Sequence, residues 1–283
     1  MTSLPPILSH VQAEVLLRAR QAKSAEIEVS TDLGRTTTRV QLVEEGIRLQ
    51  GGEVLPWPAV ERISTSPNNC FLLERGEARA IQTFSEATNR LCSLYPTRGV
   101  PSMLIAGFVM HRVKDIDPLA DTERKIAPLR PLTDQVLDTA TGLGYTAIAA
   151  ARSATEVVTI ELDPGAQAMA RLNPWSQELF DNPKIRQILG DAFEVVPSFE
   201  DEQFTRILHD PPAFSLAGDL YSGEFYRQLY RVLKRGGRLF HYIGDLNSKS
   251  GSTVTRGVLK RLQEAGFTRL TRRPEAFGVV GYK

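Results

Sequence analysis

The chain has 283 residues, of which 42% are hydrophobic and 24% charged, a balance typical of a globular protein with a sizeable core. It carries 34 lysine and arginine and 33 aspartate and glutamate residues, and the net charge of +1 excludes a uniformly basic nucleic-acid-binding protein, although charges can still segregate in space. No apolar run is long enough to cross a membrane, and residues 1–6 lack the segments of a signal peptide, so the sequence predicts a cytoplasmic protein.

Residues 1–100 predict a small α+β accessory domain. Ser9 is placed to cap a helix that ends near Lys23. Alternating segments then predict an antiparallel meander, a short helix and a hairpin, and Ser85 is expected to cap a further helix that ends at Leu94. The meander comprises residues 26–30, 37–43, 46–50 and 53–55, the short helix residues 58–63, and the hairpin residues 70–73 and 78–82.

A connecting segment is predicted at residues 101–131. Residues 103–113 are strongly apolar, whereas residues 115–131 are polar and interrupted by prolines, and they carry Asp121 and Lys125. We expect this segment to be either a lid over a ligand pocket or a simple interdomain linker. The two cysteines, Cys70 and Cys92, lack a metal-binding spacing, so we predict no metal site and expect both to be buried as small hydrophobic residues.

Residues 132–283 predict an α/β domain that begins with a strand, a glycine turn and a helix. Val136 and Leu137 end a short apolar run, Asp138 follows, and the turn holds Gly142 and Gly144 before an Ala-rich helix at 145–152. Glycines without a Cβ let backbone N–H groups approach a ligand closely. The turn from residue 141 to 147 also partly fits the Gly-x-Gly-x-x-Gly/Ala pattern of NAD-binding domains, so a dehydrogenase is a competing interpretation.

Three further strands are expected to end in polar residues. Residues 157–160 form a β-branched run that ends at Glu161, nineteen positions after Gly142, where a carboxylate can bind both hydroxyls of a ribose. Residues 185–189 lead to Asp191, which could accept from the amino group of an adenine, and residues 205–208 lead to His209 and Asp210. Ligands bind at the carboxyl ends of the strands in open α/β sheets, so these residues predict one site.

The remaining elements continue the alternation. Residues 221–233 predict a helix that stops at the glycines of residues 234–237, and residues 238–243 predict a fifth strand. A helix at 253–265 and strands at 267–271 and 277–282 complete the chain.

Together these motifs resemble the class I S-adenosylmethionine-dependent methyltransferases, over roughly residues 115–283. The resemblance implies a Rossmann-like fold with a seven-stranded, mostly parallel sheet whose last two strands are antiparallel, and S-adenosyl-L-methionine as cofactor. It implies that the Asp-x-x-x-Gly-x-Gly turn holds the methionine part, that the acidic residue after strand two holds the ribose, and that Gly-Asp-Ala after strand three meets the adenine. The cofactor-binding residues expected here are Asp138, Thr141, Gly142, Gly144, Glu161, Leu162, Asp191 and Ala192.

The Asp210-Pro211-Pro212 motif is expected to carry the chemistry. In related enzymes, an Asp-Pro-Pro-aromatic or Asn-Pro-Pro-aromatic loop grips an amino group on a planar ring. By that resemblance, Asp210 and the Pro211 carbonyl would accept the amino hydrogens and Phe214 would stack on the ring, although Ala213 intervenes before the aromatic residue. Methylation of cytosine carbon commonly needs a cysteine nucleophile, and residues 93–283 contain none, so a nitrogen is favoured.

The sequence therefore predicts an S-adenosylmethionine-dependent methyltransferase that modifies a nitrogen of a base in RNA. A small-molecule methyltransferase acting on an amine-bearing metabolite is the main alternative. A polyamine aminopropyltransferase is a further one, although the Gly-Gly-Gly-Asp-Gly turn and the Asp-Ser/Thr-x-Asp-Pro loop of that family are incomplete here. A cofactor-binding partner without enzymatic activity is the remaining alternative, and His209 could be either a base or a packed residue.

Overall fold

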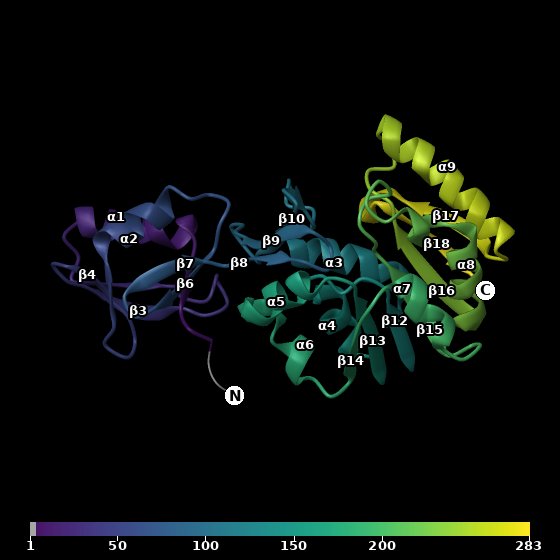
Figure 1. The fold of residues 1–283 in the computed structure, drawn as a ribbon, viewed down its shortest axis with the longest axis horizontal. Helices are drawn as coiled ribbons and strands as arrows, with labels where there is room; N and C mark the ends of the chain where they lie inside the picture. Colours follow the sequence, from purple (N-terminus) through teal and green to yellow (C-terminus); the bar gives the residue numbers. More distant parts are fainter. Residues whose placement is uncertain (1–3) are drawn as a thin grey trace. The chain divides into compact units, whose positions relative to one another are not determined.

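A computed structural model describes residues 4–283 of the chain, which divide into two compact units (Figure 1). One unit contains the described residues up to Pro118 together with Gly165–Gln177. The other contains Leu119–Pro164 and Glu178–Lys283. Residues 1–3, which belong to the N-terminal stretch considered for a signal peptide, lie outside the described residues.

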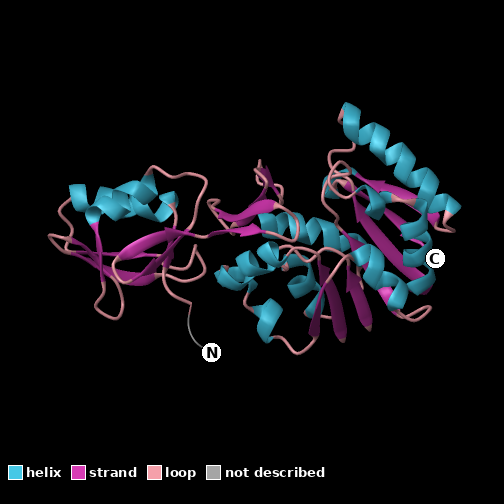
Figure 2. Cartoon of the chain, in the orientation of Figure 1, coloured by secondary structure: helices cyan, strands magenta, loops and turns pink. Residues whose placement is uncertain are grey.

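Short antiparallel strands dominate the first unit (Figure 2). The predicted N-terminal helix is confirmed as α1 (His10–Gln21), and Ser9 caps it through a reciprocal capping box with Gln12. The predicted meander is confirmed as β2 (Glu26–Val29), β3 (Thr38–Leu42), β4 (Gly46–Arg48) and β5 (Val54–Pro56), paired in that order, and α2 (Trp57–Ser64) follows. The predicted hairpin is β6 (Phe71–Glu74) with β7 (Glu77–Ala80), which β1 (Ile7–Leu8) extends. Both cysteines are buried, as expected.

The helix predicted from Ser85 to Leu94 is wrong. These residues form the antiparallel pair β8 (Gln82–Ser85) and β9 (Arg90–Tyr95), and Asn89 takes a φ of 53° in the turn between them. Asparagine tolerates this left-handed conformation, so the chain reverses where a helix would have continued. The sheet continues through β10 (Ser102–Ile105) to β11 (Phe108–Val109). The unit also includes most of α5 (Pro164–Leu172) and the 3-10 turn η2 (Pro174–Ser176).

A seven-stranded sheet forms the centre of the second unit, in the order β14-β13-β12-β15-β16-β18-β17 (Figure 1). The first five strands in this order are parallel, which confirms the predicted mostly parallel sheet. β18 is antiparallel to both of its neighbours, so β17 runs in the direction of the first five strands, and the expectation that both last strands are antiparallel holds for β18 but not for β17. The strands are β12 (Gln135–Asp138), β13 (Glu156–Glu161), β14 (Ile185–Leu189), β15 (Phe204–His209), β16 (Leu233–Tyr242), β17 (Thr268–Arg273) and β18 (Gly278–Tyr282).

Helices cover this sheet. A buried apolar cluster joins β12, β13, β15, β16 and β18 to α7 (Ala192–Val195), α8 (Gly223–Val232) and α9 (Lys249–Glu264). Helix α4 (Tyr145–Ala151) packs against β12 and β13 and contacts α6 (Glu178–Asp181). Helix α3 (Pro118–Ile126) and the 3-10 turn η1 (Ala127–Leu129) precede the first strand, in the segment predicted as a lid or linker. The other 3-10 turns are η3 (Val196–Ser198), η4 (Gly218–Tyr221) and η5 (Pro274–Ala276).

The predicted glycine stop after α8 is also wrong. Strand β16 begins at Leu233, directly after α8, because Leu233 is fully buried and pairs with Phe204 of β15. The ladder resumes at Arg206 and Arg238, so residues 234–237 form a bulge inside the strand, and Gly236 has a φ of 74° there.

In the described residues, no helix is long and apolar enough to cross a membrane.

Candidate active site

The strand register brings the predicted site residues to one edge of the sheet. Asp138 at the end of β12 pairs with Thr159 of β13 and Leu208 of β15, and all three strands are parallel. Their carboxyl ends, which lead into Glu161 and Asp210, therefore lie at the same edge, where ligands bind in open α/β sheets.

The glycine turn rests on the buried Asp138 carboxylate. Asp138 Oδ2 accepts hydrogen bonds from the Thr146 hydroxyl at 2.9 Å and the Thr159 hydroxyl at 3.2 Å. Thr159 Oγ1 also lies 2.7 Å from Thr141 Oγ1, which ties the turn to β13. Burial raises the pKa of Asp138 to about 7, and the Thr146 hydrogen bond opposes this shift. Asp138 therefore stabilises the conformation of the turn through Thr146 and Thr159. We expect it to affect cofactor binding indirectly, through that conformation.

Glu161 connects the second strand to the same turn. Its Oε2 accepts from the Gly142 backbone N–H at 2.8 Å, and its Oε1 accepts from the Asp163 backbone N–H at 2.9 Å. Burial raises the pKa of Glu161 to about 7, against the stabilising effect of these two donors. A carboxylate has about four acceptor positions, so Glu161 retains acceptors for the hydroxyls of a ribose.

The two glycines of the turn share a positive φ but differ in their surroundings. Substituting each by alanine therefore separates backbone strain from steric overlap. Both have a positive φ, 52° for Gly142 and 77° for Gly144. A Cβ on Gly144 would lie 2.7 Å from Leu179 Cδ2, whereas a Cβ on Gly142 would meet nothing within 4 Å. We expect Gly144→Ala to lower the free energy of unfolding by about 3 kcal/mol, from backbone strain and overpacking.

Gly142→Ala is expected to cost only about 1 kcal/mol, from backbone strain alone, and to act mainly on ligand affinity. Urea denaturation of both variants checks the difference. Equal losses of stability would contradict the role assigned to Leu179.

Apolar side chains flank the position predicted for an adenine. Asp191 is exposed and caps α7 by accepting from the Phe193 backbone N–H at 2.8 Å, and Ala192 is buried behind it. Leu162 and Leu189, which follow or end neighbouring strands, are each 52% exposed. Exposed leucines beside an exposed carboxylate fit a purine, whose faces are apolar and whose edge carries an amino group. Leu162 was expected at this site from the sequence, whereas Leu189 was not.

A buried lysine that the sequence analysis did not assign to the site holds the Asp210 carboxylate. Lys125 Nζ of α3 lies 2.6 Å from Asp210 Oδ2 and 3.1 Å from Asp121 Oδ2, and it sits 4.4 Å from the centre of the Tyr242 ring. Burial opposes the charge on Lys125, but the Asp210 and Asp121 carboxylates raise its pKa, so it stays protonated. Burial raises the pKa of Asp210, and the ion pair with Lys125 opposes that rise.

The second oxygen of Asp210 is open to a ligand. Within residues 4–283, no hydrogen bond reaches Asp210 Oδ1, and the side chain keeps 19% of its surface exposed. Lys125 therefore fixes the orientation of the carboxylate through one oxygen and leaves the other as an acceptor. The sequence signal for Lys125 was its i,i+4 spacing from Asp121 in a segment that ends in the apolar residues Ile126 and Leu129.

The loop after Asp210 is fixed by a hydrogen bond from Tyr221, and it carries the exposed ring of Phe214. The Tyr221 hydroxyl donates to the Pro212 carbonyl at 3.0 Å, and Pro211 is buried. Phe214 is 51% exposed and meets the Tyr221 ring edge-on, with 5.4 Å between ring centres. Its exposed ring is available to stack on a planar ligand.

Both ring nitrogens of His209 have hydrogen-bond partners inside the protein. It is fully buried, with Nδ1 2.7 Å from the Thr139 hydroxyl and Nε2 2.9 Å from the Leu220 carbonyl. Burial lowers the pKa of His209 to about 4, so the ring is neutral and Nε2 donates to the carbonyl. His209 packs 4.3 Å from the ring centre of His241, which lies 2.9 Å from the Tyr226 hydroxyl through Nε2.

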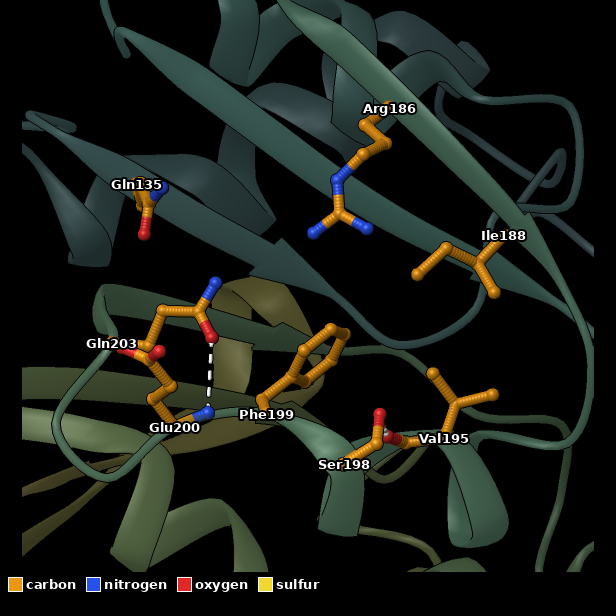
Figure 3. A pocket seen from close by; sticks show the side chains of 8 residues that line it. All are labelled: Gln135, Arg186, Ile188, Val195, Ser198, Phe199, Glu200 and Gln203. Atoms are coloured by element: carbon orange, nitrogen blue, oxygen red, sulfur yellow. Dashed lines mark hydrogen bonds between the residues drawn. The ribbon is translucent and has the colours of Figure 1, made fainter.

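A separate cavity of about 590 Å³ lies away from this edge (Figure 3). It includes Gln135, the first residue of β12, and Gln203, which precedes β15, so it is near the amino ends of those strands. The other lining residues are Arg186, Ile188, Val195, Ser198, Phe199 and Glu200. We place the candidate site at the carboxyl edge, because the polar strand-end residues converge there.

Comparison with known proteins identifies the family. A family model described as a methyltransferase domain matches residues 136–237. The uncharacterised protein MJ1233 of Methanocaldococcus jannaschii is 38% identical over 282 residues, which cover 98% of this chain and 96% of that protein. The chain belongs to the MJ1233 family.

Two more distant similarities place the MJ1233 family among known folds. Polyamine aminopropyltransferase 2 of Streptomyces coelicolor is 29% identical over 99 residues, or 33% of this chain and 18% of that protein. Spermidine synthase from Thermotoga maritima superposes with a TM-score of 0.57 and 18% identity, over 73% of this chain and 75% of that chain. This MJ1233-family chain therefore has the class I methyltransferase fold, in which S-adenosylmethionine is the methyl donor.

Proposed function

We propose that this MJ1233-family chain is an S-adenosylmethionine-dependent methyltransferase that modifies a nitrogen on a planar, amine-bearing acceptor, with a base in RNA as the favoured acceptor. The geometry of Asp210 carries this proposal. Lys125 holds Oδ2 at 2.6 Å, while Oδ1 remains available at the carboxyl edge of the sheet. A carboxylate oxygen held in one orientation can accept a hydrogen bond from a substrate amino group and so direct its nitrogen toward the methyl donor.

The residues around the glycine turn fit the cofactor. Gly142 leaves open space where a side chain would project, and Glu161 is positioned for the ribose hydroxyls. Leu162 and Leu189 would enclose the purine and Asp191 would accept from its amino group. When bound, S-adenosylmethionine supplies an electrophilic methyl group on a sulfonium.

Positioning by Asp210 and Phe214 accounts for the chemistry required of the protein. Asp210 Oδ1 and the Pro211 carbonyl would accept the two amino hydrogens, and Phe214 would stack on the ring of the acceptor. This would direct the nitrogen lone pair at the methyl group, so that the N–C bond would form as the C–S bond breaks and leaves a neutral thioether. The proton lost from the nitrogen would pass to Asp210 Oδ1 or to water. Orientation of two reactants can contribute about 7–11 kcal/mol, and exclusion of water adds to the effect. The absence of cysteine from residues 93–283 is consistent with nitrogen as the acceptor atom.

Aminopropyl transfer to a polyamine is the second candidate, and the similarity to polyamine aminopropyltransferases favours it. A cationic diamine acceptor needs carboxylates with unneutralised charge. Here the single cation Lys125 is shared between Asp210 and Asp121, and the extra carboxylates of the aminopropyltransferase motifs are missing. The missing carboxylates therefore favour a neutral acceptor nitrogen over a cationic diamine.

Transfer assays with two donors distinguish these functions. Purified protein is incubated with S-adenosylmethionine labelled in the methyl group, and separately with decarboxylated S-adenosylmethionine labelled in the aminopropyl group. Each donor is tested with cellular RNA, with fractionated small amines and with putrescine-like diamines. Methyl label in RNA or in a neutral amine supports the proposal, whereas aminopropyl transfer to a diamine without methyl transfer refutes it.

Binding of S-adenosylmethionine is expected to depend on the protonation of Glu161. The carboxylate form, which accepts from the ribose hydroxyls, grows as the pH rises through the pKa of about 7. Affinity should therefore be roughly tenfold lower near pH 6 than near pH 8 and constant above that range. Calorimetric titration across this range measures the effect.

Glu161→Gln is the control for this titration. Because an amide does not titrate, the variant should bind more weakly and with no dependence on pH. The pKa of Asp138 also lies near 7, so a pH dependence that survives in Glu161→Gln would assign the effect to Asp138 instead.

A further inference from the structure

The balanced net charge hides a strong segregation of charge along the chain. Residues 227–283 contain 13 lysine and arginine residues but only three acidic residues. The preceding 226 residues contain 21 basic and 30 acidic residues, so they are net negative. The basic segment comprises the end of α8, β16, α9, β17 and β18, all within the second unit.

Helix α9 presents part of this charge as a stripe. Lys249, Arg256 and Lys260 are exposed and are spaced seven and four residues apart, which places them on one face of the helix. Along the helix axis they are about 10 Å and about 6 Å apart. The opposite face packs into the core through Val258 and Leu262, so the charged face points outward.

The edge strand next to α9 continues the positive surface. Helix α9 contacts β17, which is the last strand of the sheet (Figure 1). Arg269 and Arg272 of β17 are exposed, and Arg272 pairs with Val279, whose side chain belongs to the core shared with α9. Paired residues project to the same face of a sheet, so Arg272 lies on the α9 side. Arg269 stacks on Tyr282, which projects to the other face of the sheet, so it is left out here. We call Lys249, Arg256, Lys260 and Arg272 the C-terminal basic surface.

Folding alone does not account for these charges. Within the described chain, only Lys260 of this surface has a carboxylate partner, Glu264 at 3.7 Å. Lys249 is the first residue of α9, where a positive charge opposes the helix dipole. Most charges of this surface are therefore available to an external anionic ligand.

The C-terminal basic surface begins at the edge of the sheet that holds the candidate active site. His209 of β15 pairs with His241 of the parallel strand β16, so Asp210 and Tyr242 end neighbouring strands. Tyr242 also contacts Lys125, the partner of Asp210. Helix α9 starts at Lys249, seven residues after Tyr242, so the stripe leads away from this edge.

We propose that the C-terminal basic surface binds the phosphate backbone of RNA and so delivers a base to Asp210. This inference rests on the proposed function, whose substrate class it specifies. The stripe and the edge strand offer a row of point charges suited to successive phosphates. The apolar face of α9 is already buried in the core, so it cannot insert into a membrane, and this favours a polyanion in solution.

Binding of a fluorescein-labelled single-stranded RNA of mixed sequence, about 20 nucleotides long, tests the inference by fluorescence anisotropy. The test variant is Lys249→Gln/Arg256→Gln/Arg272→Gln. The matched control, Arg18→Gln/Arg48→Gln/Arg79→Gln, removes the same charge from exposed positions in the first unit. Calorimetry with S-adenosylmethionine shows that each variant keeps a folded cofactor site.

The test variant should bind RNA roughly 10- to 100-fold more weakly at about 0.1 M salt, and its log–log salt slope should be smaller by about 2. The control variant should bind within about twofold of the unmodified chain. No RNA binding by the unmodified chain, or equal weakening in both variants, overturns the inference. Binding to phosphatidylserine vesicles that is tighter than RNA binding and lost in the test variant also overturns it, in favour of a membrane surface.

The same proteins separate this inference from the proposed function. If RNA binds through the surface but accepts no methyl group, the surface stands and RNA as substrate fails. If RNA does not bind while a small amine is methylated, the proposed chemistry stands and the surface assignment fails.

Discussion

Asp210→Ala is expected to lower kcat for methyl transfer by about 100-fold or more while leaving the affinity for S-adenosylmethionine nearly unchanged. The carboxylate is proposed to orient the acceptor nitrogen, and misplacement of a reacting atom by about 1 Å can cost a factor of this size. The groups proposed to bind the cofactor lie at or just after the ends of β12, β13 and β14, whereas Asp210 follows β15, so we expect cofactor binding to be largely independent of the Asp210 side chain. Single-turnover transfer and calorimetric titration measure the two quantities.

Asp219→Ala is the matched control for this prediction. Asp219 is an exposed aspartate in η4, on the same connection between β15 and α8, and no function is proposed for its side chain. Its variant should keep full activity. Parallel loss of transfer and of cofactor affinity in Asp210→Ala would mean that Asp210 organises the whole pocket instead of the acceptor.

Lys125→Gln is expected to be the most destabilising single change near the site. It leaves the buried carboxylates of Asp121 and Asp210 without their cation, and breaking a buried pair by removing one partner costs about 3–5 kcal/mol. Loss of Lys125 also raises the pKa of Asp210 further, because only the ion pair and its hydrogen bond oppose the effect of burial.

The pH dependence of Lys125→Gln follows from the sign of that shift. A carboxyl group whose pKa is raised in the folded state favours folding at low pH, and this contribution is lost as the pH rises through the raised value. The stability deficit of the variant should therefore be larger near pH 8 than near pH 5, and the acidic limb of its kcat profile should move to higher pH. Urea denaturation at both pH values and a pH–rate profile measure these effects.

Arg124→Gln provides the neighbouring control. Arg124 is exposed on the same helix, so its removal should change the free energy of unfolding by less than about 0.5 kcal/mol. A similar small change in Lys125→Gln would show that water replaces the missing cation, and it would remove Lys125 from its proposed positioning role.

The strand-end part of the site could be predicted from sequence because its signals are local. A β-branched run before Glu161 and a glycine turn after Asp138 each indicate a strand end, and parallel pairing brings such ends to one edge. The same reasoning placed the seven strands in the correct class of sheet. The contact between Gly142 and Glu161 follows directly from this arrangement.

The contributions that sequence did not reveal depend on contacts between distant segments. Lys125 and Asp210 are 85 residues apart, and the i,i+4 spacing of Lys125 from Asp121 does not indicate that Asp210 is its second partner. In the sequence, Leu189 is indistinguishable from a buried strand residue, and only the structure shows that it is half exposed. The helix predicted at residues 85–94 failed for a local reason, because the turn conformation of Asn89 outweighed the pattern of apolar residues.

The position of Lys125 before the first strand of the sheet has a practical consequence for dissection of the protein. A shortened chain beginning at Leu132 would retain all seven strands and every carboxylate of the strand ends, yet would lack α3. Asp210 would then carry a proton more readily and lose its fixed orientation. Such a fragment could bind nucleoside ligands while turning over poorly, so catalytic work on the isolated sheet domain should start upstream of Pro118.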